Sequence, residues 1–334
     1  MSAAPRRGAP AMDPGAPRMS VVIVTPDTFA TIRRTVECLA RQTARGALEL
    51  VVVAPSLAHL DADGALLASF ARVVRVEGGA IGSIGPANAE GVRRASAPIV
   101  ALAEDHAFPD PDWAERLIAA HEGPWAAVGP SIRNANPGSA VSRADLLIGY
   151  GPWLTPADAR EVPFLPGHNT SYKREVLLGI GERLGTMLDA ETLLHWELRS
   201  RGHRLWLEPS ARIAHANFSL WRSWLPAQYH YGRLFAGLRA NGMPRWRRLV
   251  YVAGSPLIPA VRLARIWREA GARPGHRAPW SCLHALVAGL AMDGLGQMVG
   301  YALGTGRAAD RVARYEFHRA RHVRPDERRE LWPA

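Results

Sequence analysis

The sequence predicts an α/β fold with a doubly wound, mostly parallel sheet. Continuous apolar runs, of which 21–24 and 99–102 are the clearest, alternate with segments whose apolar residues recur at helical spacing. Strands that are apolar at every residue are typical of sheets covered on both faces, as parallel sheets are. Ligands bind such sheets beyond the carboxyl ends of the strands, so polar residues that follow a strand are candidates for a functional site.

Each element is predicted from its own local pattern. In the first helix, apolar residues recur at helical spacing over 29–39, after Asp27 or Thr28 as the cap. The predicted strands cover 20–24, 48–53, 73–76, 99–102, 125–128, 203–207 and 211–214. The predicted helices cover 28–45, 57–70, 87–95 and 190–201, and a stretch rich in Pro, Gly and Asn at 134–166 is expected to be mostly loop.

Composition divides the chain of 334 residues into four segments. Residues 1–18, rich in Pro, Ala, Gly and Arg, are expected to form a disordered tail without an export signal. The sheet domain covers 19–241, apolar membrane-associated helices cover 242–310, and a basic tail covers 311–334.

The segment 242–310 contains two apolar stretches. The first, 249–267, is interrupted by arginines and prolines and is expected to lie at an interface. The second, 281–304, has no Lys or Arg and is long enough to cross a bilayer, for which about 20 residues suffice. Gly296 and Gly300 follow the spacing that lets membrane helices approach closely. Asp293 and His284 count against a lipid-facing span, so a buried helix that covers the sheet domain is the alternative.

The formal net charge of +11 comes almost wholly from arginine. Such a charge suits nucleic acid, phosphate-bearing substrates or an anionic membrane. The densest arginine cluster flanks and interrupts the apolar stretches after Asn241, as basic residues do on the cytoplasmic side of a membrane, so a membrane surface is favoured over nucleic acid. A solvated basic surface is the alternative. Cys38 and Cys282 indicate neither a disulfide framework nor a zinc cluster, which favours a reducing, cytoplasmic setting.

The motif with the clearest chemistry is Glu104-Asp105-His106, directly after the apolar run 99–102. Carboxylate oxygens and an imidazole nitrogen suit magnesium or manganese. The alternative is that these acids only stabilise the N-terminus of the helix that follows. The longer segment 103–113 resembles the Asp-x-Asp region of family 2 glycosyltransferases, in which a strand ends in two or three acids followed by Pro-Asp-Trp.

This resemblance implies a GT-A fold, a nucleotide-sugar donor and a divalent metal, Mg²⁺ or Mn²⁺, that neutralises charge on the leaving diphosphate. By position, Glu104 matches the acid that faces the nucleotide, and Asp105 is assigned both to donor binding and to the metal as a ligand. His106 takes the place of the metal-ligating acid. His215, at the end of the run 211–214, resembles the histidine that is a further metal ligand in many such enzymes. The alternative is that His215 has only a structural role.

Other segments extend the resemblance to 20–239. Thr25 and Pro26 resemble the loop that contacts the nucleotide, and Asn88 lies in a segment similar to the family's Arg-Asn-x-Gly helix start. Two positions depart from the family, because Ala54 replaces the usual base-binding Asp and Ala87 replaces the usual arginine. Either Arg93 and Arg94 provide the missing charge or they are ordinary solvent-facing residues.

The acceptor side and the catalytic base are also implied by resemblance. Gly167, His168 and Asn169 resemble the family's acceptor-side glycine loop, with a plain turn as the alternative. Glu191 takes the place of the catalytic base that removes the proton of the acceptor hydroxyl in an inverting transfer. Asp189 is the substitute base if Glu191 does not act. The alternative is that Glu191 only stabilises the N-terminus of its helix.

The sequence therefore predicts an inverting, metal-dependent glycosyltransferase at the cytoplasmic face of a membrane. Its partners would be a nucleotide-sugar donor, an envelope or lipid-linked glycan acceptor and the membrane surface, without nucleic acid. A relative that has lost catalysis and binds a glycan or a partner protein is the alternative. A nucleotidyltransferase is disfavoured, because 25–28 after the first strand is not a Gly-rich, basic loop.

Overall fold

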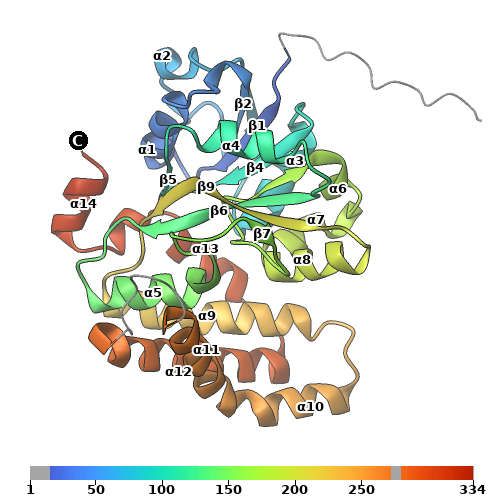
Figure 1. Cartoon of the computed structure of the whole chain (residues 1–334), viewed down its shortest axis with the longest axis vertical. Helices are drawn as coiled ribbons and strands as arrows, with labels where there is room; N and C mark the ends of the chain where they lie inside the picture. The colour runs from blue at the N-terminus through green and yellow to red at the C-terminus, as the bar shows by residue number, and fades with distance from the viewer. Residues whose placement is uncertain (1–15, 272–279, 334) are drawn as a thin grey trace, which may run out of the picture.

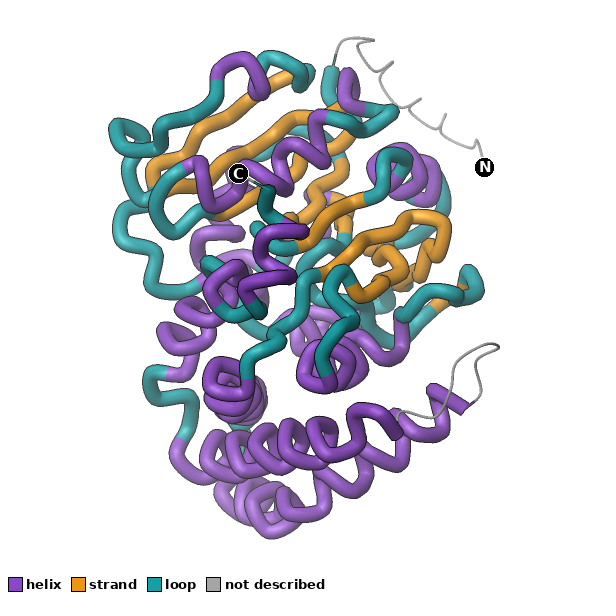
Figure 2. Tube along the Cα trace, turned by 90° about the vertical axis from the view of Figure 1, so that its left-hand side faces the viewer, coloured by secondary structure: helices purple, strands orange, loops and turns teal. Residues whose placement is uncertain are grey.

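The computed structural model describes residues 16–271 and 280–333, so most of the predicted N-terminal tail lies outside the described residues. An α/β domain with one mixed sheet lies above a layer of long helices in the view of Figure 1. Figure 2 shows the same two parts from the side, with the strands in one and the long helices in the other. The predicted α/β fold with C-terminal apolar helices is confirmed.

The described strands form one nine-stranded sheet in the order β3-β2-β1-β4-β8-β6-β9-β5, with β7 paired to β9. Strands β1 to β4 are parallel to one another, whereas β8 is antiparallel to both of its neighbours. Strand β9 runs parallel to β6 and antiparallel to β5. The strand bounds are β1 (Met19–Val24), β2 (Leu48–Ala54), β3 (Arg72–Glu77), β4 (Ile99–Ala103), β5 (Ala107–Pro109), β6 (Ala127–Asn134), β7 (Arg160–Glu161), β8 (Ser171–Lys173) and β9 (Leu205–His215).

Three of these strands differ from expectation in a way that bears on the site. The two short strands predicted on either side of Pro209 are one strand, β9, whose pairing with β6 shifts between Pro130 and Ser131. Strands β5 and β8 each contain three residues, too few for a periodic pattern in the sequence. The first half of the sheet is thus parallel as predicted, and the second half is mixed.

Helices cover both faces of the sheet. Val21 and Ile23 of β1 belong to the core under α1, whereas Val22 and Val24 belong to the core under α3. The alternation follows from the two-residue period of a strand, and it explains why every residue of β1 is buried. The helices of this domain are α1 (Phe29–Ala40), α2 (Gly64–Leu67), α3 (Ile84–Arg94), α4 (Trp113–Ala120), α6 (Arg174–Leu178), α7 (Leu184–Leu188) and α8 (Glu191–Ser200).

The helical layer is organised around α12, which packs along α9. Its glycines make this approach possible, because a Cβ at Gly296 would overlap the Tyr229 carbonyl of α9 and one at Gly300 would lie 2.5 Å from the Arg233 carbonyl. The small-residue spacing therefore brings α12 against another helix of this chain. The helices of the layer are α5 (Ala140–Tyr150), α9 (Trp221–Arg239), α10 (Arg245–Gly254), α11 (Ile258–Gly271) and α12 (Leu283–Leu303).

A buried charge pair lies inside this layer. Asp293 of α12 is 5% exposed and accepts hydrogen bonds from Arg262 of α11 at 2.5 Å and from Gln297 at 2.9 Å. Asp293, which counts against a lipid-facing span, is thus paired inside the protein with Arg262 of α11 and with Gln297 of its own helix. By length and composition alone, 245–270 and 280–303 both qualify as membrane spans, with 11% and 50% of their most apolar windows buried in the protein.

The segment predicted as a basic tail, 311–334, is part of the folded domain in its described residues. Helices α13 (Ala308–Glu316) and α14 (Pro325–Leu331) return to the sheet, and α14 lies beside α1 in Figure 1. The backbone N–H of His318 donates to Asp105, and Leu331 and Trp332 pack near Phe108. The tail prediction is wrong here because apolar residues and buried hydrogen bonds anchor the arginine-rich segment.

The packing of α12 on α9 gives a first prediction. Gly296→Ala should lower the free energy of unfolding by about 1–3 kcal/mol, because the added methyl group overlaps the Tyr229 carbonyl. Gly254→Ala is the matched control, since no heavy atom lies within 4 Å of the position that its methyl group would occupy. Urea denaturation of both variants measures the difference, and equal midpoints would contradict this packing.

Candidate functional site

The candidate site lies where β4 and β9 end. Glu104 to His106 follow the last residue of β4, and His215 is the last residue of β9. Short strand β5 pairs Ala107 with His215, so the two strand ends are held side by side. The predicted position of the site, beyond the carboxyl ends of buried strands, is the position that this sheet provides.

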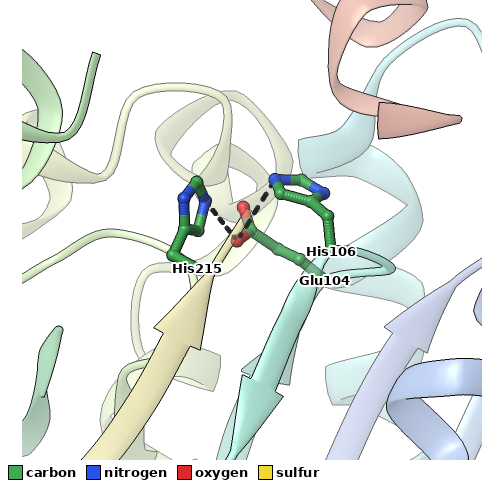
Figure 3. A group of neighbouring side chains, drawn as sticks. All are labelled: Glu104, His106 and His215. Atoms are coloured by element: carbon green, nitrogen blue, oxygen red, sulfur yellow. Dashed lines mark ion pairs between the residues drawn. The ribbon is translucent and has the colours of Figure 1, made fainter. Parts of the chain in front are cut away.

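Glu104, His106 and His215 point toward one another (Figure 3). The Nε2 atoms of His106 and His215 lie 3.7 and 3.6 Å from Glu104 Oε2, and one ligand atom from each residue falls within 4.8 Å of the others. All three side chains are at most 9% exposed. Two imidazole nitrogens and a carboxylate oxygen around one point suit a divalent transition metal such as Mn²⁺.

Each histidine is oriented by its other ring nitrogen. His106 Nδ1 lies 2.5 Å from Asp105 Oδ1, and His215 Nδ1 lies 3.0 Å from Asn217 Oδ1. Metal-bound histidines characteristically use their second nitrogen in this way, so the arrangement fits a metal site. Asp105, predicted as a ligand, instead orients His106 and accepts the His318 N–H, and Glu104 takes its place in the cluster.

The charges of the cluster suit a cation. Burial disfavours the ionised form of Glu104, yet the imidazoles around it hold its pKa well below the usual range. Burial, together with the charge of Arg319, lowers the pKa of His106, which leaves that imidazole neutral and able to act as a ligand. Burial raises the pKa of Asp105 to about 7, although Arg319 opposes this effect.

His168 joins the cluster to the predicted base. Its Nδ1 lies 3.0 Å from Glu104 Oε1, and its Nε2 lies 2.9 Å from Glu191 Oε1 as an ion pair that lacks hydrogen-bond geometry. Burial alone would lower the pKa of His168, but Glu191 and Glu104 raise it well above the usual range. The structure thus brings together the residues predicted for the acceptor side, the base and the donor.

The other two residues of the glycine loop, Gly167 and Asn169, support these contacts of His168. A Cβ at Gly167 would lie 2.8 Å from Glu191 Oε2, so only glycine lets the loop approach that carboxylate so closely. Asn169, with φ of 74°, occupies the left-handed region and donates from Nδ2 to Glu104 Oε2 at 3.0 Å. The loop therefore positions both carboxylates.

Asp189 does not join this group of side chains. It lies just before α8, and its Oδ1 accepts hydrogen bonds from Ser83 Oγ at 2.5 Å and from the Gly85 N–H at 2.8 Å. These contacts satisfy the N-terminus of α3, which is a structural task. Glu191 is consequently the better placed of the two predicted bases.

The cavity beside the cluster is small, with a volume of about 20 Å³. Asn88 is buried, borders this cavity, and has no hydrogen-bond partner for Oδ1 among the described residues. Thr25 does not border it; its hydroxyl donates to the Thr28 carbonyl at 2.6 Å and shapes the loop that contains Pro26. The cavity is lined by Val24, Ile84, Asn88, Ala103, Glu104, Asp105, His106, His168, Glu316 and Phe317.

Arg93 and Arg94 do not provide charge at the cavity. Both are solvent-facing and pair with Glu90 on the same helix, Arg94 at 3.0 Å. The solvent-facing alternative is therefore the one that the structure shows.

Sequence reasoning missed three residues of the site. Tyr150, the last residue of α5, places its hydroxyl 3.0 Å from His215 Nε2. Glu316 and Arg319 come from the segment expected to be a tail, and Arg319 Nη2 lies 2.5 Å from Glu316 Oε2 and 3.2 Å from His106 Nε2. A Glu and an Arg three residues apart are common on helix surfaces, so no local signal distinguished this pair.

Residues 20–181 match the family described as glycosyl transferase family 2. The matched stretch contains Glu104 and the glycine loop, whereas Glu191, His215 and Arg319 lie beyond it. The resemblance is thus borne out over these residues, which are similar to family 2 glycosyl transferases. Among curated proteins, no sequence matches this chain.

Several solved structures are similar in arrangement. TarS 1–349 from S. aureus in complex with UDP has a TM-score of 0.44 and 14% identity, covering 85% of this chain and 91% of that one. Mannosyltransferase PcManGT from Pyrobaculum calidifontis, with GDP-Man and Mn²⁺, has a TM-score of 0.48 and 17% identity, covering 94% and 85%. GalNAc-T7 with UDP, GalNAc and Mn²⁺ has a TM-score of 0.47 and 16% identity, covering 66% and 48%. Similarities this distant do not show which activity this chain has.

The cluster gives a second prediction. His106→Ala and His215→Ala should each weaken Mn²⁺ binding by at least about tenfold, since even changes to residues that orient a metal ligand cost about 10- to 100-fold. Both variants should remain folded. His59→Ala, an exposed histidine on the sheet domain, is the control. Calorimetric titration with Mn²⁺ measures the affinities, and unchanged curves for both variants would rule out this site.

Proposed function

We propose that this protein transfers a sugar from a nucleotide-sugar donor to a hydroxyl of a glycan or lipid-linked acceptor, in a metal-dependent, inverting reaction. The observation that carries the proposal is a series of side-chain contacts that runs from the His106–Glu104–His215 cluster through His168 to Glu191. These contacts join a candidate cation site to a carboxylate through one histidine. The family match over 20–181 supports the same class of reaction.

In this proposal the donor is held at the cluster. Glu104, His106 and His215 would hold the divalent ion, which when bound neutralises negative charge on the departing diphosphate. Asn88, with its partnerless Oδ1, is placed to bind a polar group of the donor in the cavity. Buried polar atoms are rarely left without a partner, which supports a ligand at this position.

The proposed base is Glu191, which lies on the far side of His168 from the cluster. Glu191 Oε1 makes no hydrogen bond among the described residues, although it is buried beside His168. An acceptor hydroxyl that donates to this oxygen gives up its proton as its own oxygen attacks the anomeric carbon, and the bond to the diphosphate breaks on the opposite face. The configuration at that carbon is thereby inverted. Gly167 and His168 hold the carboxylate in place for this step.

A non-catalytic binding protein is the second candidate, and two positions favour it. Ala54 and Ala87 are buried and have no polar side chain where the related enzymes carry a base-binding Asp and an arginine. Such a protein retains the cavity and binds its ligand without transfer. The two functions differ in the need for Glu191, which has no role in binding the donor.

We further propose that the protein works at the cytoplasmic face of a membrane, bound in the plane of its surface. Helices α10 and α11, with the single turn 255–257 between them, expose apolar side chains, and arginines flank these side chains on the same helices. A basic, apolar helical face is typical of binding to anionic lipid interfaces. The exposed side chains are Trp246, Leu249, Val250, Leu257 and Val261, each at least 61% exposed.

The position of α12 supports this in-plane arrangement over a span. Half of its most apolar window is buried in the protein, and its Asp293 pairs with Arg262 of α11. Pulling α12 into lipid would separate it from α9 and expose that charge pair, which is costly in hydrocarbon. A membrane-bound donor site of this kind favours an acceptor that is itself lipid-linked or part of the envelope.

The third prediction tests the base. Glu191→Gln should reduce transfer by about 10²- to 10⁴-fold, as removal of a general base does, while donor affinity stays nearly constant. Release of nucleoside diphosphate in the presence of a lipid-linked glycan extract measures transfer, and calorimetry measures donor binding. Glu182→Gln, an exposed acid nearby in the chain, is the control. Transfer by the variant at the wild-type rate would remove Glu191 from this role.

The fourth prediction tests the membrane face. The full chain should sediment with vesicles that contain anionic lipid and resist extraction by salt, because apolar contacts do not depend on ionic strength. Trp246→Ser combined with Leu249→Ser and Leu257→Ser should abolish the salt-resistant fraction. The substitutions are preferable to truncation near Asn241, since truncation would remove α12 and uncover α9.

The matched control for the membrane test is Leu57→Ser, which removes an exposed apolar side chain from the sheet domain. It should sediment as the unaltered chain does. A full chain that stays in the supernatant without detergent, or a triple variant that sediments like the control, would contradict the membrane proposal.

A further inference from the structure

Arg319 is a buried cation at the edge of the candidate site with unused hydrogen-bonding capacity. It is 2% exposed, and its Nη2 contacts Glu316 Oε2 and His106 Nε2. Its Nε and Nη1 have no hydrogen-bond partner among the described residues. Buried donors without partners are rare, and a guanidinium matches the oxygens of a phosphate group particularly well. The free N–H groups thus indicate that an anion binds here.

The backbone and two neighbours fix this guanidinium in place. His318, just before it, has a φ of 59° in the left-handed region and donates its backbone N–H to Asp105 at 3.0 Å. The turn formed there directs Arg319 toward His106. On the other side, Arg319 Cζ lies 3.7 Å from the centroid of the Phe218 ring, and the Phe218 N–H donates to Asp145 at 3.0 Å. Arg319 is thus held in advance of any ligand.

The charge around this position requires a second cation once a diphosphate is present. Glu104 and Glu316 already contribute carboxylates beside the cavity, so a diphosphate adds negative charge to an acidic wall. One divalent ion carries two positive charges, fewer than the negative charges of the diphosphate and these two carboxylates together. Ala87 offers no charge there, and Arg93 and Arg94 face solvent. Arg319 is the arginine that contacts the cluster within the described residues.

We propose that Arg319 binds the diphosphate of the nucleotide-sugar donor and of the nucleoside diphosphate that leaves. Its Nε and Nη1 donate to phosphate oxygens, while Nη2 keeps its contact with Glu316. Glu316 and Phe317 line the cavity and Arg319 contacts His106 beside it, although this segment lies far beyond the family match at 20–181. The inference rests on the proposed function and names a residue that the function alone does not require.

Calorimetric titration with UDP and with GDP, each in the presence of Mn²⁺, tests the proposal on the full chain. Arg319→Gln should weaken binding of the nucleoside diphosphate that the wild type prefers by about 10- to 100-fold, the loss typical of a hydrogen bond to a charged group. Arg319→Lys should recover part of the affinity. Arg314→Gln, which removes an exposed arginine from α13, is the control and should bind as the wild type does.

A second readout separates ligand contact from structural support. Without nucleotide, Arg319→Gln should bind Mn²⁺ at least as well as the wild type, because a cation 3.2 Å from His106 Nε2 opposes metal binding. Glu316→Gln combined with Arg319→Gln removes the pair without leaving a buried charge and should show the same loss of nucleotide affinity. If either variant loses Mn²⁺ and nucleotide binding together, Arg319 is structural and the inference is overturned.

The remaining outcomes separate this inference from the proposed function. Equal nucleotide affinity in Arg319→Gln and the wild type overturns the inference and leaves the proposed function intact. A wild type that binds neither nucleoside diphosphate with Mn²⁺ or Mg²⁺ overturns both.

Discussion

The carboxylate of Glu104 is the group on which the site depends. Its Oε2 faces His106 and His215 and accepts a hydrogen bond from Asn169, while its Oε1 pairs with His168. These partners come from both strand ends and from the glycine loop. A buried carboxylate is stable only when its oxygens are satisfied, so the burial of Glu104 forces these segments to converge.

The need to satisfy this buried carboxylate explains why several segments of the chain converge on one small cavity. Strand β5 pairs with β9 and sets the distance between His106 and His215, and Gly167 lets the loop reach Glu191. Asp189, close in sequence to Glu191, is committed instead to the N-terminus of α3. Two neighbouring acids thus have different tasks, because only Glu191 contacts His168 and, through it, Glu104.

The parts of the site that lie at the ends of regular strands could be predicted from sequence. Glu104 follows a fully apolar run, and His215 follows the predicted strand 211–214, so the topology of an α/β sheet predicts that they meet. Three-residue strands such as β8 have no period to detect. The glycines of α12 suit packing against lipid-embedded or soluble helices equally, so their partner α9 could not be read from the spacing.

The C-terminal contribution could not be predicted for a different reason. Arg319 and Glu316 have no pattern that distinguishes them from surface residues, and their burial arises from contacts with residues more than two hundred positions earlier, such as His106. Only the tertiary structure shows that an arginine-rich segment contains a buried member. Long-range hydrogen bonds, such as that of His318 to Asp105, determine its position.

The helical layer is inserted between two parts of the site. The chain leaves the sheet at His215, builds α9 to α12, and returns through α13 to Arg319. Both ends of this excursion contact His106, one through ring packing at 4.8 Å between centroids and the other through a guanidinium at 3.2 Å. The two segments that flank His106 are therefore the two ends of one excursion of the chain, so a displacement of the helical layer would reach both of them along the backbone.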